Sequence, residues 1–261
     1  MKFTLNILFI FLLLFLNGCS NKTVQYSQKT ELTIDNQTED EFLDEFADEM
    51  EVEEKADPLN GYNRAMTTFN DSLYEYVLSP VARGYTKVVH KEIRSSVNKF
   101  FHNIFYPIRV INNVLQGKFK NAGEETGRFL INSTIGVLGL FDPAKSEFGL
   151  EPHNEDFGQT LGFWGVGSGP HIVLPFLGPS NLRDTISLYP DSYANPVDFY
   201  DERGYNITHN YGESLFLKAY EKVNYISLHE GEYEKLKKDA VDLYPFLRDI
   251  YEQYRQKQIE E

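Results

Sequence analysis

The stretch DFGQTLGFWGVGSGPHIVLPFLGPSNLRD, residues 156–184, decides what kind of fold the chain can form. Its first half is rich in glycine, and its second half is apolar and divided by prolines. Because glycine frees the backbone and proline restrains it, residues 167–170 predict a tight turn. Residues 171–177 follow as a short apolar arm. Since an apolar arm exposed to water promotes aggregation, we expect it either inside a core or against a solvent other than water.

The N-terminus has the pattern of a signal peptide, residues 1–18. Lys2 supplies the positive charge, and residues 5–16 form an apolar run shorter than the roughly 20 residues that span a bilayer. Cys19, the one cysteine of the 261 residues, follows directly. The fold must therefore be stable without a disulfide within the chain. A lone cysteine can be an inert thiol, but the sequence of Asn17, Gly18 and Cys19 after an apolar run resembles the lipobox of bacterial lipoproteins.

The lipobox resemblance implies how the protein is anchored. In such lipoproteins the signal peptide is removed before the cysteine, whose sulfur carries a diacylglycerol and whose amine is acylated. Two or more acyl chains suffice for a stable anchor, at about 0.8 kcal/mol per buried methylene. Ser20 rather than aspartate follows Cys19, and by the same resemblance this favours the outer membrane.

An acidic segment separates the lipobox from the body of the protein. Residues 31–57 contain 13 Asp and Glu against one lysine, a net charge of −12 in a chain whose total is −14. Such a run repels itself, so residues 19–56 are expected to form a disordered tether, which serves as a spacer or recruits a basic partner. The rest of the chain is near neutral and has no basic patch, which argues against a nucleic-acid partner.

The body, residues 57–255, has the periodicity of amphipathic helices. Apolar residues recur at steps of three and four from the Asp57-Pro58 start, and no series of alternating strands is visible. We expect helices near 59–76, from Pro80, and over 93–104, 108–115 and 118–135. Further helices are expected from Ser180 as a cap to just before Pro190, over 211–223, and from 232 onward with a kink or split at Pro245. Residues 256–261 are expected to be a polar tail.

Several motifs in fixed order resemble the MlaA (VacJ) family of phospholipid-transport lipoproteins. They are DPLNGYNR at 57–64, NNVLQG at 112–117, GRFLINSTIG at 127–136, EDFGQTLG at 155–162, GVGSGP at 165–170, LPFLGPS at 174–180 and LRD at 182–184. The resemblance implies a mainly α fold, a ring-like bundle of amphipathic helices in the periplasmic leaflet of the outer membrane with a Gly/Pro-rich, hairpin-like loop. It also implies passage of mislocalised phospholipid from the outer leaflet to a soluble periplasmic carrier, with a trimeric porin as scaffold and an ATP-driven inner-membrane transporter beyond.

The resemblance and the glycine pattern together suggest two sets of site residues. A mobile mouth, the gating loop, is expected at Gly162, Gly165, Gly167, Gly169, Pro170 and Pro175. Residues that line the lumen or contact the scaffold are expected among Arg64, Asn112, Asn113, Arg128, Asn132, Arg183 and Asp184, although each of these can equally be a buried hydrogen-bonding residue.

Signals for catalysis are weak, so we expect no enzyme activity, cofactor or metal. Ser168 lacks the flanking glycines of a nucleophile elbow. His153, Glu155 and Asp156 match no metal-binding spacing, and Asp156 can simply cap a helix. Two alternatives to lipid transport remain: a lipoprotein that braces a porin without moving lipid, and a phospholipase.

Overall fold

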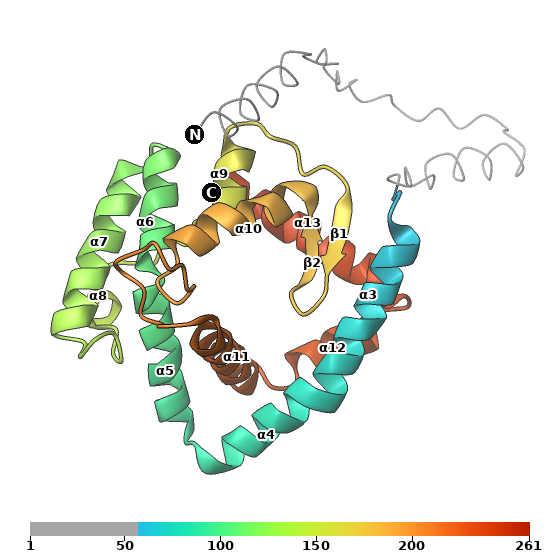
Figure 1. Ribbon diagram of the computed structural model, residues 1–261, viewed down its shortest axis with the longest axis horizontal. Coiled ribbons are helices and arrows are strands. Elements are labelled where there is room, and N and C mark those ends of the chain that lie inside the picture. Colours follow the sequence, from blue (N-terminus) through green and yellow to red (C-terminus); the bar gives the residue numbers. More distant parts are fainter. Residues whose placement is uncertain (1–56) are drawn as a thin grey trace, which may run out of the picture. The chain divides into compact units, whose positions relative to one another are not determined.

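The helices of residues 57–261 follow one another around a ring, as Figure 1 shows. The computed structural model describes these residues. The predicted signal peptide (1–18), the lipidation site Cys19 and the tether (19–56) lie outside the described residues. The mainly α fold expected from the sequence is confirmed, and so is a hairpin in the Gly/Pro-rich stretch.

The apolar stripe after Asp57 forms one continuous helical run along the ring. Helix α3 (Asn60–Leu73) passes into a π-helical turn, η1 (Tyr74–Leu78), and then into α4 (Ser79–Val88). The sequence predicted a separate helix that starts at Pro80, but the helical backbone does not break there. Because proline lacks an N–H, the wider hydrogen-bonding pattern of the π turn before it accommodates the missing donor.

The next helices begin and end close to the predicted positions. They are α5 (Lys91–Ile104), α6 (Tyr106–Leu115) and α7 (Phe119–Thr134). The short helix α8 (Pro143–Ser146) follows. Gly117 adopts a φ of 74° between α6 and α7, a conformation that glycine reaches without steric cost. The side chain of Asp142 caps α8 by accepting a hydrogen bond from the Lys145 N–H at 3.2 Å.

Two helices flank the hairpin. Asp156 and Gln159 form a capping box at the start of α9 (Phe157–Phe163). Helix α10 (Leu182–Ala194) is capped by Asn181, whose Oδ1 accepts from the Asp184 N–H at 2.8 Å, and not by the predicted Ser180. The expectation that this helix ends before Pro190 was wrong, because α10 continues through the proline for four more residues.

Three helices complete the chain: α11 (Tyr211–Leu228), α12 (Glu232–Asp239) and α13 (Leu243–Glu260). The split predicted at Pro245 falls just before α13, and Pro245 lies in its first turn. The predicted polar tail, 256–261, includes the last turn of α13, which ends at Glu260. A Cβ placed on Gly162 would lie 2.6 Å from Ile259 Cδ1, so this last turn packs against α9.

The apolar arm forms the first strand of the hairpin. Strand β1 (His171–Leu174) pairs antiparallel with β2 (Gly178–Asn181), with Leu174 opposite Gly178. At the turn, Phe176 has a φ of 67° and Gly178 a φ of 92°. Four-residue strands are too short for a periodicity of two to stand out in the sequence, which is why the arm was not recognised as a strand.

Two asparagines of α3 hold the hairpin against that helix. Asn63 accepts from the Val173 N–H at 2.9 Å and donates to the His171 carbonyl at 3.0 Å. Two turns further on, Asn70 donates to the Leu174 carbonyl at 2.9 Å and accepts from the Phe176 N–H at 2.8 Å. Both amides thus take the place of a neighbouring strand along β1, and the hairpin stays attached although it pairs with no further strand among residues 57–261.

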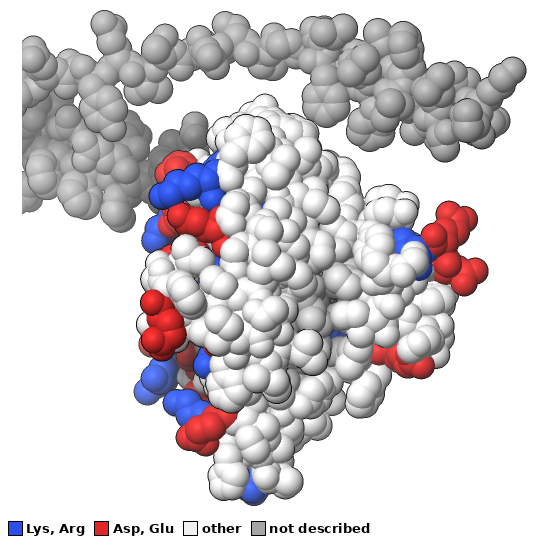
Figure 2. Space-filling model, turned by 90° about the vertical axis from the view of Figure 1, so that its left-hand side faces the viewer, with Lys and Arg blue, Asp and Glu red and all other residues white. Residues whose placement is uncertain are grey.

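Among the described residues, most buried side chains are polar and many large apolar side chains are exposed. Eight apolar residues make up the buried core, whereas 27 polar or charged residues are buried. The large apolar side chains that remain exposed number 36 and occur on almost every helix. Figure 2 views the side of the ring formed by α5 to α8; charged side chains lie mostly along the edges, and a broad area between them carries none. Large apolar side chains exposed in such numbers are typical of a surface that contacts another protein or a membrane.

Replacing the two asparagines tests how the hairpin is held. Asn63→Ala leaves a buried N–H and a buried carbonyl unpaired and should lower the free energy of unfolding by about 1–3 kcal/mol. Asn70→Ala acts at the half-exposed turn, so we expect faster amide hydrogen exchange over residues 174–177 with a smaller loss of stability. Asn60→Ala, on the same helix but bonded only to Arg64, is the control. Unchanged exchange in all three variants would contradict this account.

Candidate functional site

Glu125 is the centre of a buried ion-pair cluster between α6 and α7. Its side chain is fully buried and accepts hydrogen bonds from Arg109 Nε at 2.6 Å and from the His153 N–H at 2.7 Å. Arg128 Nε lies 3.8 Å from its second oxygen. Because an unpaired buried carboxylate costs several kcal/mol, this cluster fixes α6, α7 and the segment before α9 to one another.

Arg128 and Asn132 extend the cluster to α8. Arg128 Nη2 donates to Asp142 at 2.8 Å, and its Nη1 donates to the Leu150 carbonyl. Asn132 donates to the other oxygen of Asp142 at 2.9 Å and accepts from the Ala144 N–H at 3.1 Å. Burial alone raises the pKa of Asp142, but the hydrogen bonds from Arg128 and Asn132 outweigh it and lower the pKa below its ordinary value.

Asn112 joins three helices at one point. It accepts from Thr160 Oγ1 of α9 at 2.8 Å and donates to Asp191 of α10 at 3.0 Å. Asp191 also accepts from the Phe157 N–H at 3.0 Å. Burial raises the pKa of Asp191 to about 6, and nearby Asp156 acts in the same direction. Asp191 is therefore a half-buried carboxyl with a pKa of about 6.

Asp184 is the corresponding centre between α10 and α13. It accepts hydrogen bonds from Arg183 at 2.9 Å, from Arg255 at 2.9 Å and from the Tyr251 hydroxyl at 2.7 Å. Burial raises the pKa of Asp184, yet these donors together lower it to about 2. Gly158 approaches so closely that a Cβ on it would lie 2.4 Å from Asp184 Oδ1 and 2.5 Å from Arg255 Nη2. This position therefore requires glycine.

The structure places the seven predicted lumen or scaffold residues mainly inside these clusters. Six are buried and hydrogen-bonded within the chain: Asn112, Asn113, Arg128, Asn132, Arg183 and Asp184. Arg64 is not among them, because it lies half-exposed on α3 with its guanidinium 2.7 Å from Asp242. None of the seven lines the cavity described below, and a role in lipid passage stays a prediction for each.

The predicted gating loop is divided between packed and turning segments. Gly162 belongs to α9 and packs against α13. Gly165 and Gly169 have φ values of 87° and 67°, whereas Gly167 does not need a left-handed backbone. The loop is tied to the start of α10, because the Leu182 N–H donates to the Pro170 carbonyl at 3.0 Å and the Arg183 N–H to the Ser168 carbonyl at 3.1 Å. Pro170 precedes β1, and Pro175 opens the hairpin turn. Movement of this loop stays a prediction.

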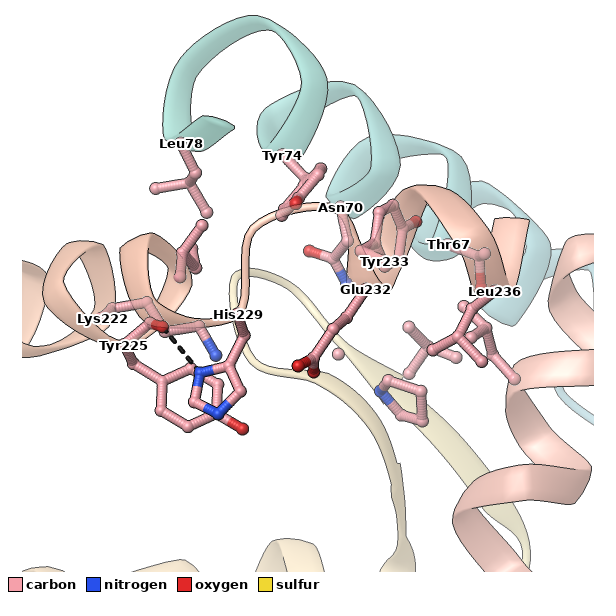
Figure 3. A pocket seen from close by; sticks show the side chains of 15 residues that line it. Thr67, Asn70, Tyr74, Leu78, Lys222, Tyr225, His229, Glu232, Tyr233 and Leu236 are labelled. Atoms are coloured by element: carbon pink, nitrogen blue, oxygen red, sulfur yellow. Dashed lines mark hydrogen bonds between the residues drawn. The ribbon is translucent and has the colours of Figure 1, made fainter. Parts of the chain in front are cut away.

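A cavity of about 290 Å³ lies where α3, the hairpin, α11 and α12 approach one another. Figure 3 shows its side chains, among them Thr67 and Asn70 of α3, Leu78 of η1, and Tyr233 and Leu236 of α12. This volume is near the lower end of the roughly 300–1,000 Å³ of ligand pockets. Apolar groups dominate the wall: Tyr74, Leu78, Val173, Pro179, Tyr225, Ile226, Tyr233, Leu236 and Leu247.

Sequence reasoning missed this cavity because its residues come from segments far apart in the chain. The lining runs from Thr67 to Leu247, and no local spacing relates those positions. One signal was present: Gly231, which has a φ of 82°, separates α11 from the short, charge-rich α12, and this break places the side chains at the end of α11 beside those at the start of α12.

The residues considered for catalysis have structural partners. His153 Nε2 lies 2.6 Å from Glu124, and Glu155 accepts from Gln116 and from Lys118, both at 2.7 Å. Within residues 57–261, no group of three or more His, Cys, Asp or Glu side chains is arranged to hold a metal ion. Likewise, none of the helices in this range is long and apolar enough to cross a membrane.

The fold and the site define a mainly α-helical protein with a paired polar interior, an apolar exterior and a small apolar cavity beside a hairpin. Residues 55–258 match the family described as MlaA lipoprotein. The chain belongs to the MlaA lipoprotein family, as its sequence motifs predicted.

Several relatives and one solved structure are similar to half or more of the chain. An uncharacterized protein of Rickettsia prowazekii is 34% identical over 207 residues, 78% of each chain. The intermembrane phospholipid transport system lipoprotein MlaA of Haemophilus influenzae is 35% identical over 147 residues, 56% of this chain and 59% of its own. The lipoprotein of the same name in Escherichia coli is 36% identical over 135 residues, which are 50% of this chain and 53% of its own. One similar solved structure is described as the structural basis for maintenance of bacterial outer membrane lipid asymmetry. It superposes with a TM-score of 0.63 at 28% sequence identity, over 78% of this chain and 100% of that chain.

The pKa of Asp191 predicts an unusual pH dependence of stability. Because its folded pKa is about 6 and its ordinary value 3.8, the folded protein holds this proton more tightly than the unfolded chain does. The stabilisation is complete below pH 3.8 and is lost as the pH rises through 6. We therefore expect the difference in unfolding free energy between wild type and Asp191→Asn to change by about 3 kcal/mol over this window.

Unfolding by denaturant in detergent micelles, at a series of pH values, measures this difference. Asp239→Asn, which removes an exposed carboxyl at the end of α12, is the control and should follow wild type. Parallel stability curves for wild type and Asp191→Asn would contradict the assignment.

Proposed function

We propose that the protein is an outer-membrane lipoprotein that removes mislocalised phospholipid from the outer leaflet and passes it toward the periplasm. Its relatives in Haemophilus influenzae and Escherichia coli are named as lipoproteins of an intermembrane phospholipid transport system. The similar solved structure concerns bacterial outer-membrane lipid asymmetry. Membership of the same family supports the same general task for this chain.

The observation that carries the proposal is the inverted distribution of polarity. A helix satisfies its own backbone hydrogen bonds, so a ring of helices can lie within one leaflet without spanning the bilayer. Exposed side chains such as Phe119, Leu130 and Leu138 then contact acyl chains. We propose that the ring lies in the periplasmic leaflet, held there by acyl groups on Cys19 in addition to this surface.

The cavity supplies a segment of the lipid path. Moving a charged headgroup through hydrocarbon is very costly, so a conduit needs polar groups beside apolar walls. The cavity has both, because Asn70, Lys222 and Glu232 line it together with Val173 and Leu236. We propose that the neighbouring hairpin and the loop from Gly162 to Pro175 control entry to this path.

The remaining roles follow from the family resemblance. We propose a trimeric porin as the scaffold and a soluble periplasmic protein as the lipid acceptor. We propose no enzyme activity and no cofactor, because the carboxyl and imidazole groups near Glu155 are engaged in capping and ion pairs.

Filling the cavity tests the conduit. Leu236→Trp adds bulk from α12 at a residue that is 39% exposed, so the fold should tolerate it while the path is obstructed. In cells with this variant as the sole copy, we expect phospholipid to accumulate in the outer leaflet to about the level of a deletion strain. Labelling of surface-exposed phosphatidylethanolamine by an impermeant amine reagent measures it.

Lys235→Trp is the matched control, because Lys235 neighbours Leu236 on α12 but does not line the cavity. Both variants must be present at the wild-type level. Normal asymmetry in Leu236→Trp cells would contradict the path. Loss of porin alone in the deletion strain would indicate bracing, and release of free fatty acid by the purified protein would indicate a phospholipase.

A further inference from the structure

One end of the cavity carries opposite charges on adjacent helices. Lys222 projects from α11 and Glu232 from the start of α12, with the imidazole of His229 between the two segments (Figure 3). His229 stacks on Tyr225 with ring centroids 4.1 Å apart, and its Nδ1 lies 2.8 Å from the Tyr225 carbonyl. Since a carbonyl only accepts, Nδ1 carries a proton, and Nε2 of the neutral ring is left as an acceptor.

These two charges form no ion pair within the fold. Among residues 57–261, neither the Lys222 ammonium nor the Glu232 carboxylate has an ion-pair partner within 4.0 Å. Lys222 Nζ lies 5.9 Å from the centroid of the Tyr225 ring, a weak cation–π contact. Lys237 on α12, in contrast, does form ion pairs. Its ammonium lies 2.8 Å from Asp71 and 2.6 Å from Glu75 and so links α12 to α3 and η1.

The other end of the same cavity is apolar. Val173 and Pro179 of the hairpin, Leu236 of α12 and Leu247 of α13 form its wall. A ligand that satisfies both ends has an apolar part and a headgroup with a positive and a negative charge. At about 290 Å³, the cavity accommodates a headgroup with the nearest methylenes, and not two complete acyl chains.

We propose that this end of the cavity is a subsite for the zwitterionic phosphoethanolamine headgroup of a phospholipid, an inference that rests on the proposed lipid path. Lys222 pairs with the phosphate. The ammonium lies against Glu232, where the acceptor Nε2 of His229 also favours a cation. A headgroup with a phosphate but no ammonium, as in phosphatidylglycerol, leaves Glu232 unpaired beside a negative charge, and so it binds less well.

Competition between the two lipids tests the subsite in the full, lipidated chain. The purified protein is equilibrated with detergent micelles that contain equal amounts of phosphatidylethanolamine and phosphatidylglycerol, and bound lipid is quantified by native mass spectrometry. Wild type should favour phosphatidylethanolamine. Glu232→Gln should lower that preference about threefold, the effect of losing one partly exposed ion pair, and Glu232→Lys should reverse it. Lys222→Gln should weaken both lipids to a similar degree, because both carry the phosphate.

Two exposed neighbours that do not line the cavity serve as matched controls, Glu230→Gln and Lys235→Gln. Both should retain the wild-type ratio and amount of bound lipid. If wild type binds neither lipid, the proposed lipid path itself is wrong. If wild type binds lipid but Glu232→Gln and Glu232→Lys keep the wild-type ratio, the headgroup subsite is wrong and the path is unaffected.

Discussion

The structure depends on the pairing of buried carboxylates with arginines. Glu125 is fully buried, and it is tolerable there only because Arg109, Arg128 and the His153 N–H surround it. Asp184 plays the same part between α10 and α13, where it lies between Arg183 and Arg255. Removing one partner of such a pair leaves an uncompensated charge, so each cluster fixes the distance and orientation of the helices that meet in it.

Because polar side chains make many of the contacts between helices, many apolar side chains remain on the surface of the protein. In a water-soluble bundle the apolar stripes of neighbouring helices pack on each other; here helices meet through asparagine, arginine and carboxylate, and Phe119, Leu130 and Leu138 remain exposed. An apolar exterior is stable where the surrounding solvent is itself apolar, and within one leaflet this holds for helices that do not cross the bilayer. The cavity forms away from the clusters, where the side-chain amides of Asn63 and Asn70 hold the hairpin beside α3.

The sequence predicted the helices better than their contacts. Periodicity and the Asp-Pro and glycine signals gave the bounds of α5, α6 and α7 to within a few residues, since those signals are local. Continuation of α10 through Pro190 and the strands of the hairpin depend on tertiary contacts that no local pattern encodes. Capping by Asn181 is a local bond to the Asp184 N–H, but Ser180 and Asn181 are both common capping residues, so the sequence did not decide between them. The polar residues of the family motifs were recognised, but whether Asn112 binds lipid or Thr160 could not be read from its spacing. Lys222 and Glu232 were missed because their importance lies in having no partner, which only the structure reveals.

The central claim is that the exposed apolar side chains face lipid. A quenching experiment tests it with the full chain in bilayers whose acyl chains carry bromine. Trp164, the one tryptophan of the sequence, is replaced by phenylalanine, and a new tryptophan is placed either at Phe119, which is 70% exposed, or at its neighbour Lys120, whose side chain is 87% exposed. The account predicts strong quenching at position 119 and little at position 120. Equal quenching at both positions, or none at 119, would contradict it.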